Sequence, residues 1–352
     1  MFDRVHIAAF RELDLEEHEQ LDSKRNVWRV PLASRRLPKN IVSQLLQYLE
    51  WMLKIVWRFR KEDIRVVHCH DLPALPIGVL LKAFKRSRVV YDAHELETET
   101  MYLSGIKKKM ARYLETVLIR FADRLIVVSD SIAEWYKHEY DLKNAWTIRN
   151  VPYRPDNSSL QDSAMLKEKF GIAREAILFI CQGVLKKNRG IELLLDVFSR
   201  SDSTRHIVFM GFGPLEGLVK EYDTKFPSIH FQPAVAPEEI IYYSKSADIG
   251  ISLIENACLN YYYSLPNKVF EYILSGIPLV VSDFPDMGKI VDEYDCGWKV
   301  DPGNKEQIFQ LVNNISLDDI MEKREGVQKC REAIVGWEKE EIKLKQLYQS
   351  LV

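Results

Sequence analysis

Short apolar runs alternate with amphipathic stretches along almost the whole chain, and this alternation restricts the possible folds more than any other feature. The runs predict strands at residues 5–10, 65–69, 88–92, 124–129, 176–182, 206–211, 229–232, 249–253 and 278–282. The amphipathic stretches predict helices at residues 41–60, 73–84, 107–121, 130–139, 191–199, 215–225, 238–246, 267–274 and 305–314. Apolar strands separated by helices are typical of a parallel sheet that helices cover on both faces. The sequence therefore predicts an α/β fold with doubly wound parallel sheets.

The alternation restarts near residue 176, after a polar stretch rich in Pro, Asn and Ser at residues 150–162. Such stretches commonly separate domains, and 352 residues, of which 47% are apolar, are enough for two cores. We predict an N-terminal domain over residues 1–155, a C-terminal domain over residues 156–336 and a terminal helix over residues 337–352. Each domain is expected to hold one sheet, with a ligand in the cleft at the carboxyl ends of the strands.

The composition argues against several classes of protein. No apolar stretch of the sequence approaches the ~20 residues that a membrane-spanning helix needs, and no secretory signal follows Met1. Five scattered cysteines without a C-x-x-C spacing indicate buried thiols in a reducing compartment, so we expect a cytoplasmic protein. The sequence has no basic motif with interleaved aromatic residues, which argues against a nucleic-acid partner.

Residues 24–65 are strongly basic, with eleven Lys and Arg against three Asp and Glu. In the helix predicted there, Trp51 and Trp57 are mixed with cations such as Lys54 and Arg58. Two interpretations remain open. A basic amphipathic helix with tryptophans can lie in a membrane interface, which would place the protein peripherally at the inner face of the membrane. An ordinary helix packed on a sheet, with its charges solvated, has the same pattern.

The stretch from Ser264 to Asp283 carries the most specific signal for function. It predicts a turn, a short helix that starts after Pro266, and a buried strand. The free N–H groups at the start of the helix and the Lys268 side chain favour an anion. Glu271 lies three residues after Lys268, so the two side chains can share a face of the helix. This arrangement suits a nucleotide, with phosphate at the helix tip and ribose hydroxyls on the glutamate.

Two glycine-containing loops follow predicted strands in the same half of the chain. Residues 182–190 include Gly183 and Arg189, and residues 211–214 include Gly211 and Gly213. Such loops let backbone and guanidinium groups close on phosphate. Each signal is weak alone, because a solvated basic loop or a simple turn would look alike. Together with the stretch that begins at Ser264 they predict three loops converging on one crevice.

Polar residues also end two predicted strands in the first half of the chain. His70 and Asp71 follow one strand, and His94 and Glu95 follow the next, so we expect these four side chains to face the crevice. His68 is interpreted as a hydrogen-bonded core histidine. A His-x-His pair with a nearby Asp can bind a metal, but the sequence offers no third ligand at a fixed spacing, and we predict no metal site.

Four motifs together resemble the retaining GT-B glycosyltransferases, and more narrowly the group 1, family four branch that elongates bacterial surface polysaccharides. They are residues 67–76, 91–95, 122–129 and 265–283. The resemblance covers nearly the whole chain. It implies two Rossmann-like domains that face each other across a cleft, with the acceptor in the first and a nucleotide sugar in the second. It also implies that the terminal helix packs back on the first domain.

The resemblance assigns roles to individual residues. Glu271 would hold the ribose hydroxyls, Arg189 and Lys268 would neutralise the diphosphate, residues 234–238 would line the base, and His94 would contact the donor sugar. The predicted catalytic residues are therefore His94, Arg189, Lys268 and Glu271. The predicted donor-binding residues are Gly183, Arg189, Gly211, Gly213, Val235, Leu265, Pro266, Asn267, Lys268 and Glu271. The candidates on the acceptor side are His70, Asp71 and Glu95.

The chain departs from the family pattern at two points. Tyr263 occupies the position of the first glutamate of a pair that the family separates by seven residues. The chain also begins directly at the family's second strand, so the first domain is expected to lack its opening strand and glycine-rich turn. Either the sequence is incomplete at its N-terminus or the first sheet lacks an element.

The resemblance implies an enzyme that transfers a hexose from a nucleoside diphosphate sugar, with UDP favoured, to a glycan or lipid-linked acceptor. It implies retention of the anomeric configuration. Neither a metal nor a cofactor is expected, because the cations already named would stabilise the leaving diphosphate. Two alternatives stay open. One is a nucleotide-sugar epimerase with acids and bases on both cleft walls, and the other is a non-catalytic scaffold that binds a nucleotide.

Overall fold

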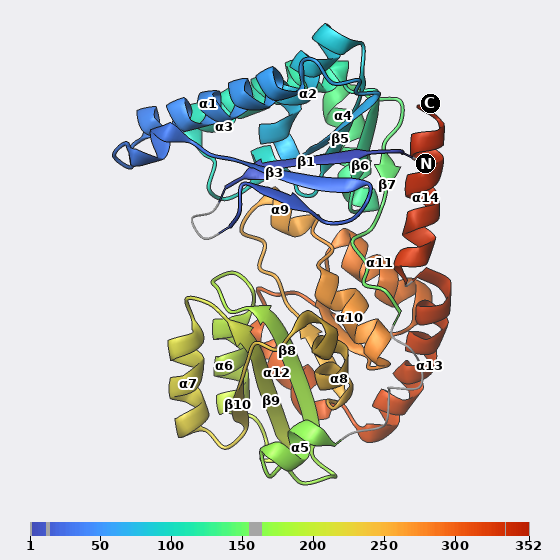
Figure 1. Cartoon of the computed structure of the whole chain (residues 1–352). Coiled ribbons are helices and arrows are strands. Elements are labelled where there is room, and N and C mark those ends of the chain that lie inside the picture. The colour runs from blue at the N-terminus through green and yellow to red at the C-terminus, as the bar shows by residue number, and fades with distance from the viewer. Residues whose placement is uncertain (1, 12–14, 155–163, 335, 352) are drawn as a thin grey trace. The chain divides into compact units, whose positions relative to one another are not determined.

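The computed structural model describes residues 2–11, 15–154, 164–334 and 336–351 (Figure 1). These residues form two compact units. The first unit comprises the described residues within 1–93, together with residues 112–125 and 351. The second comprises residues 94–111 and the described residues within 126–350. The domain boundary expected at residues 155–156 lies outside the described residues, and the predicted domain bounds and docking of the terminal helix stay predictions.

The N-terminal part of the chain contains two separate sheets among its described residues. One has three strands in the order β1-β3-β2, in which β1 (Val5–Phe10) is parallel and β2 (His18–Gln20) antiparallel to β3 (Arg25–Val30). The other has the order β4-β5-β6-β7. The expectation of one sheet in this domain was therefore wrong. The sequence signal failed because β2 has only three residues, all exposed, and β3 buries only Val27 and Val30.

Each helix and strand that was predicted before residue 154 is present close to its expected position. Besides β1, β2 and β3, the elements up to residue 154 are η1 (Ala33–Arg36), α1 (Ile41–Phe59), β4 (Val66–His70), α2 (Asp71–Lys85), β5 (Arg88–Ala93), η2 (Glu97–Glu99), α3 (Gly105–Leu118), η3 (Ile119–Phe121), β6 (Arg124–Val127), α4 (Asp130–Tyr140) and β7 (Trp146–Thr147).

The second unit is built on a six-stranded sheet whose neighbours are all parallel. Its strands are β8 (Ile177–Val184), β9 (Arg205–Phe212), β10 (Ile229–Pro233), β11 (Ile249–Ser252), β12 (Leu279–Ser282) and β13 (Gly297–Val300). The order β10-β9-β8-β11-β12-β13 runs outward in both directions from β8 and β11. This is the doubly wound order, and its ligand site lies where the direction reverses, at the carboxyl ends of β8 and β11. The predicted fold class is confirmed.

The helices of the second unit cover both faces of this sheet. The helices of this unit that follow residue 163 are α5 (Met165–Lys169), α6 (Ile191–Ser199), α7 (Glu216–Lys225), η5 (Pro237–Glu239), α8 (Ile240–Lys245), α9 (Leu259–Tyr262), α10 (Asn267–Ser275), α11 (Pro285–Tyr294), α12 (Lys305–Asn314), α13 (Leu317–Ile334) and α14 (Trp337–Gln349). Figure 1 shows α6 and α7 on one side of β8 and β9, and α8 and α10 on the other. Among these elements, α5, α9, α11, α13 and β13 were not predicted.

Alternate side chains of β8 feed two separate hydrophobic cores. Ile177 and Phe179 belong to the core under α6 and α12, while Leu178 and Ile180 belong to the core under α8, α10 and α13. Period-two alternation with both faces buried is the reason this strand reads as a continuous apolar run. The two hydrophobic cores therefore hold β8 from both faces of the sheet, and the site lies at the carboxyl end of this strand.

Two findings bear on the predicted location of the protein. All five cysteines carry free thiols, and Cys258 is the one that is only partly buried. Among the described helices, none combines the length and the apolar character that crossing a bilayer would require.

Candidate functional site

A pocket of about 470 Å³ lies in the second unit at the carboxyl ends of β8, β9 and β10 and at the start of α10. It includes the carboxyl end of β8, beside the reversal of strand order where ligands bind in doubly wound sheets. The pocket is lined by Gln182, Gly183, Val184, Lys186, Arg189, Met210, Gly211, Phe212, Ala234, Val235, Pro237, Ile240, Pro266, Asn267, Lys268 and Glu271. Segments almost ninety residues apart in sequence thus meet in one cavity, as the three-loop prediction required.

The Glu271 carboxylate is held by a buried polar network. Gln182, which is only 4% exposed, donates from Nε2 to Oε2 of Glu271 at 2.5 Å. Its own amide oxygen accepts a hydrogen bond from the hydroxyl of Ser244. Burial raises the pKa of Glu271, against the opposing effects of the Gln182 hydrogen bond and the nearby Lys268. The network therefore fixes the direction in which one carboxylate enters the pocket.

Two cations lie beside this carboxylate. Burial lowers the pKa of Lys268, and the neighbouring Arg189 adds to the shift while Glu271 opposes it. The Arg189 guanidinium lies over the ring of Tyr261, 4.7 Å from its centroid, which fixes the planar group. With Lys186, the lining carries three cations and one carboxylate. An anion that approaches these half-desolvated cations would relieve their mutual repulsion.

Close backbone approaches shape the floor of the pocket. Gly183 and Gly211 are register partners on β8 and β9. A Cβ built on Gly211, whose φ is +155°, would overlap the carbonyl oxygen of Gly183. Gly183 has a φ of +112°, which side chains rarely adopt, and open space beside it. Only glycine suits both positions, so the two strand ends meet without side chains between them.

Helix α10 is anchored so that its N-terminus faces the pocket. A Cβ on Gly250 of β11 would overlap the Tyr272 ring, so the helix packs directly on bare strand backbone. The Tyr272 hydroxyl accepts from the N–H of Gln182 at 3.1 Å and donates to the carbonyl oxygen of Ile180 at 3.2 Å. These contacts tie α10 to β8. They place Asn267 and Lys268, at the positive end of the helix dipole, against the strand end.

Comparisons with known proteins agree with this geometry. A family model described as "Glycosyl transferases group 1" matches residues 162–345, which is more than half of the chain. A second, "Glycosyltransferase Family 4", matches residues 3–150. The chain belongs to the group 1 glycosyltransferases.

Distant relatives of this glycosyltransferase carry curated names. A chitobiosyldiphosphodolichol beta-mannosyltransferase from Candida albicans is 20% identical, and the match covers 90% of this chain and 78% of the relative. A putative teichuronic acid biosynthesis glycosyltransferase from Bacillus subtilis, TuaH, is 24% identical over 64% of this chain and 57% of the relative. Among the first relatives matched, the share of the relative covered ranges from 57% to 78%.

Solved structures with the same fold superpose on most of this chain. Sucrose-phosphate synthase from Thermosynechococcus elongatus superposes with a TM-score of 0.78, at 16% identity, over 99% of this chain and 89% of that one. Anabaena HepE in complex with UDP-glucose superposes with a TM-score of 0.68, at 16% identity, over 88% and 84% of the two chains. At these identities the likeness shows the GT-B fold of the glycosyltransferase.

Most of the predicted donor-binding residues line the pocket of the glycosyltransferase. They are Gly183, Arg189, Gly211, Val235, Pro266, Asn267, Lys268 and Glu271. The structure does not bring Gly213 and Leu265 into the lining. A Cβ on Gly213 would lie 2.6 Å from the carbonyl oxygen of Leu185, and Leu265 packs in the core beneath α10. These two residues shape the loops around the pocket.

His94 and Glu95 are outside the pocket lining. The exposed side chain of His94 is not among the lining residues, and its catalytic role stays a prediction. Glu95 accepts a hydrogen bond from Nδ2 of the buried Asn260 at 2.9 Å, and Asn260 accepts from the N–H of Leu96 through its oxygen. Glu95 is therefore part of a polar network that joins the 94–96 segment to α9.

Tyr263, which replaces the family glutamate, follows the last residue of α9 and is not part of the lining. Its carbonyl oxygen accepts a hydrogen bond from Ser129.

The first unit contains a cluster of three possible ligands, although the sequence analysis found no third ligand for its His-x-His pair. Nε2 of His68 lies 2.8 Å from Oδ2 of Asp92, and Nδ1 of His70 lies 3.5 Å from the same oxygen. Ligand atoms of the three residues all lie within 4.8 Å of one another, a grouping that could hold a metal ion. Asp92 supplies the third group from the neighbouring strand, as the register partner of His70. Asp71 begins α2 with a φ of +62°.

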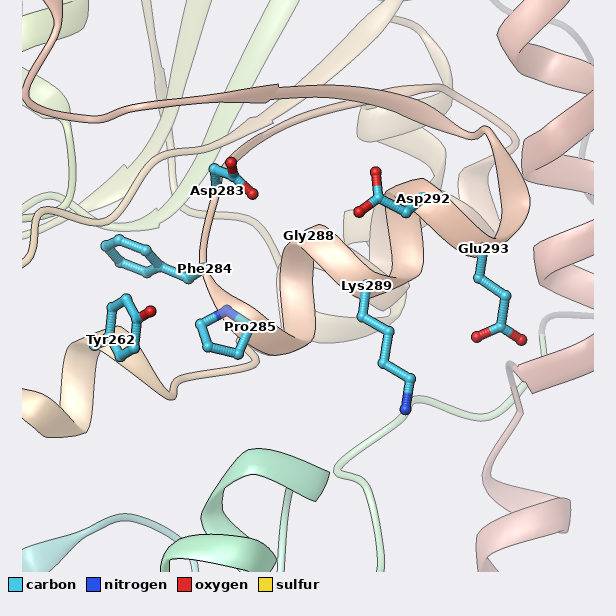
Figure 2. A pocket seen from close by; sticks show the side chains of 8 residues that line it. All are labelled: Tyr262, Asp283, Phe284, Pro285, Gly288, Lys289, Asp292 and Glu293. Atoms are coloured by element: carbon cyan, nitrogen blue, oxygen red, sulfur yellow. The ribbon is translucent and has the colours of Figure 1, made fainter.

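Another pocket of the second unit, about 570 Å³ in volume, lies along α11 (Figure 2). Figure 2 shows Asp283 and Asp292 on one side of the helix, whereas the side chains of Lys289 and Glu293 extend toward the opposite side. Its charged lining consists of three carboxylates and one lysine. Lys299 pairs with both Asp283 and Asp292. An excess of carboxylates repels phosphate, so this pocket does not suit a nucleotide.

Sequence reasoning did not assign a role to Gln182. The residue ends an apolar run and looks like the last polar position of a strand. Its role follows from the packing of α8 and α10, because Ser244 and Glu271 come from those two helices. The available signal was a buried-strand glutamine directly before a glycine, which is a weak one.

Proposed function

We propose that this protein transfers a hexose from a nucleoside diphosphate sugar, with UDP favoured, to a glycan or lipid-linked acceptor. The reaction retains the anomeric configuration and needs neither a metal nor a cofactor. One observation carries the proposal. In a pocket at the reversal of strand order, Glu271 lies beside Lys268 and Arg189 at the N-terminus of a helix.

The pocket offers a distinct surface to each part of such a donor. Glu271, oriented by Gln182, accepts hydrogen bonds from the two ribose hydroxyls. Lys268 and Arg189 bind the diphosphate together with the first N–H groups of α10. Ala234, Val235 and Pro237 form an apolar wall on which the base can rest. The bare backbone at Gly183 lets the sugar phosphate approach closely.

The comparisons support a UDP-sugar donor and a phosphate-linked acceptor. HepE, of the same fold, has been solved with UDP-glucose. The relative from Candida albicans is named for an acceptor joined to dolichol through a diphosphate. A mildly basic N-terminal part suits an acceptor of that charge. The five free thiols suit a reducing compartment, and we place the reaction in the cytoplasm.

The proposed chemistry asks the protein mainly for electrostatic stabilisation. The bond between the anomeric carbon and the β-phosphate oxygen breaks, and the acceptor oxygen forms the new bond on the same face. The leaving phosphate takes the acceptor proton. Lys268, Arg189 and the helix N-terminus stabilise the charge that develops on the diphosphate. Because these groups are already positioned, no metal is needed for that task.

Transfer assays and calorimetry test the proposal. Purified protein should bind UDP more tightly than GDP or ADP, and should slowly hydrolyse a UDP-hexose in the absence of acceptor. Glu271→Gln should weaken UDP binding, whereas Glu216→Gln, a change on α7 outside the pocket lining, should not. Binding of UDP without any turnover would identify a non-catalytic scaffold. If Glu271→Gln kept both UDP binding and hydrolysis, this pocket would not be the donor site.

The stereochemical part needs its own measurement. The curated relative is named for a beta-mannosyl product, so the anomer must be determined directly. We expect the product of an α-linked donor to show an α-anomeric proton by NMR. A β-linked product would refute retention while leaving the donor site intact.

A further inference from the structure

We propose that the outer face of α1 lies in the headgroup region of an anionic lipid bilayer and holds the protein at a membrane surface. This inference uses no residue of the donor pocket, so it stands or falls independently of the proposed reaction. Of the two interpretations of residues 24–65, it selects the helix that lies in a membrane interface.

Helix α1 has two apolar faces. Its inner face packs Trp51, Ile55 and Phe59 into the core of the first unit, against Val30 and residues of α2. The outer face repeats apolar residues every four positions on the opposite side of the helix. Among these residues, Leu53 is 61% exposed and Trp57 is 66% exposed. The exposed residues of this face are Ile41, Val42, Leu45, Leu46, Leu49, Leu53 and Trp57. A helix that is apolar on both sides is expected to be covered on both sides.

The charges of α1 are kept away from this outer face. Glu50 is the only acidic residue in the helix. Its carboxylate accepts hydrogen bonds from the N–H groups of Ala33 and Ser34 and pairs with Lys54 at 2.8 Å. Burial opposes its ionisation, but these bonds prevail and lower the pKa of Glu50 to about 2. The carboxylate is therefore bonded to the loop before α1, and the outer face of the helix presents no negative charge to a membrane.

Cations flank the outer face at both of its ends. Arg35, Arg36 and Lys39 precede the helix and are exposed. At the other end the guanidinium of Arg60 lies over the indole of Trp57, 3.2 Å from the ring centroid. Tryptophan with adjacent arginine is characteristic of helices that lie in the interface between headgroups and acyl chains.

Helix α3 has an exposed apolar stripe of the same kind. Ile106, Met110 and Tyr113 are 76%, 67% and 73% exposed and follow one another at helical spacing. Lys107, Lys109 and Arg112 lie among them. A second helix that combines exposed apolar residues with cations makes a lipid surface the fitting partner.

The charge distribution favours a bilayer over a second copy of this chain. Because both ends of α1 are basic, pairing the outer faces of two copies would bring like charges together in either direction. Anionic headgroups complement both ends at once.

Vesicle co-sedimentation tests the proposal with the full-length protein. We expect binding to vesicles of phosphatidylcholine with phosphatidylglycerol, weaker binding to phosphatidylcholine alone, and weakening by salt. The double variant Leu49→Gln and Leu53→Gln should lose about tenfold or more of its vesicle affinity. A control double variant, Met321→Gln and Ile342→Gln, changes two apolar residues on α13 and α14 that are at least as exposed as Leu49 and should bind as the unchanged protein does.

Thermal unfolding by circular dichroism shows whether each variant is folded, and analytical ultracentrifugation reports the oligomeric state without lipid. Equal vesicle binding by the Leu49/Leu53 variant and the unchanged protein would overturn the proposal. A dimer that this variant converts to a monomer, with no binding to anionic vesicles, would assign the face to a second copy instead. Unfolding of this variant would shift the test to Arg35→Gln with Lys39→Gln, which must then lower binding to anionic vesicles.

Discussion

The donor pocket and the His68–His70–Asp92 cluster both lie at carboxyl ends of parallel strands, yet they are held in different ways. In the pocket, Glu271 is oriented by Gln182, which is 4% exposed and itself bonded to Ser244. In the cluster, His70 reaches Asp92 at 3.5 Å and its side chain is 64% exposed. A site with a buried supporting network is organised before its ligand arrives. The comparison indicates that the pocket is organised more firmly than the His68–His70–Asp92 cluster.

The largest expected effect separates these two regions by reaction step. Arg189→Ala and Lys268→Ala should each reduce hydrolysis of a UDP-hexose by roughly 10²–10³-fold, since each removes a positioned charge from the leaving diphosphate. Asp92→Asn should leave this hydrolysis unchanged and reduce only transfer to an acceptor. Steady-state rates with and without acceptor measure both. Equal loss of hydrolysis in Asp92→Asn would erase the distinction between the regions.

Rigidity of the pocket floor gives the next prediction. Gly211→Ala forces a methyl group against the carbonyl oxygen of Gly183, and we expect it to lower the free energy of unfolding by about 2–4 kcal/mol. Gly217→Ala is the matched control, because it lies inside α7 with nothing within 4 Å of its new Cβ. That change should be neutral or stabilise by about 0.5–1 kcal/mol. Denaturant titration compares the two, and similar stabilities would show that the floor is not tightly packed.

The supporting network predicts a pH dependence. Ribose binding requires the ionised form of Glu271, whose pKa burial has raised, so UDP affinity should fall as the pH drops through that raised value. The hydrogen bond from Gln182 opposes this rise. Gln182→Leu should therefore move the loss of affinity to a higher pH. Calorimetric titrations across a pH series give both curves, and coincident curves would contradict the role of Gln182.

Much of this arrangement could be predicted from sequence, and the reason is local continuity. The helix after Pro266, its Lys268 and its Glu271 lie within six residues, so their shared face follows from helical spacing alone. Five of the six strands of the second sheet follow from uninterrupted apolar runs such as that of β8, and β13 does not. These features do not depend on which segments meet in space.

The remainder depends on contacts between distant segments. Gln182 gains its role only when α8 and α10 pack on β8, and Asp92 joins His68 and His70 only through the register of β4 and β5. Strand β2 has three exposed polar residues and β3 buries only two side chains, so little in the sequence indicated that β3 pairs with both β1 and β2. The sequence left two interpretations of α1 open, because burial of its inner face is not visible in sequence.

The smallest expected effect concerns metal ions. Prolonged treatment with EDTA should change neither UDP affinity nor the rate of UDP-hexose hydrolysis, because cationic side chains carry the diphosphate charge. The unchanged protein and a His70→Ala variant should respond alike in the hydrolysis assay. Loss of hydrolysis on chelation, restored by a divalent cation, would show that the reaction needs a metal.

The most direct test of the account is a crystal structure of the protein soaked with UDP. We predict that the diphosphate contacts Lys268, Arg189 and the N-terminus of α10, and that both ribose hydroxyls donate to Glu271. A nucleotide bound along α11, or one whose ribose lies away from Glu271, would contradict the central claim.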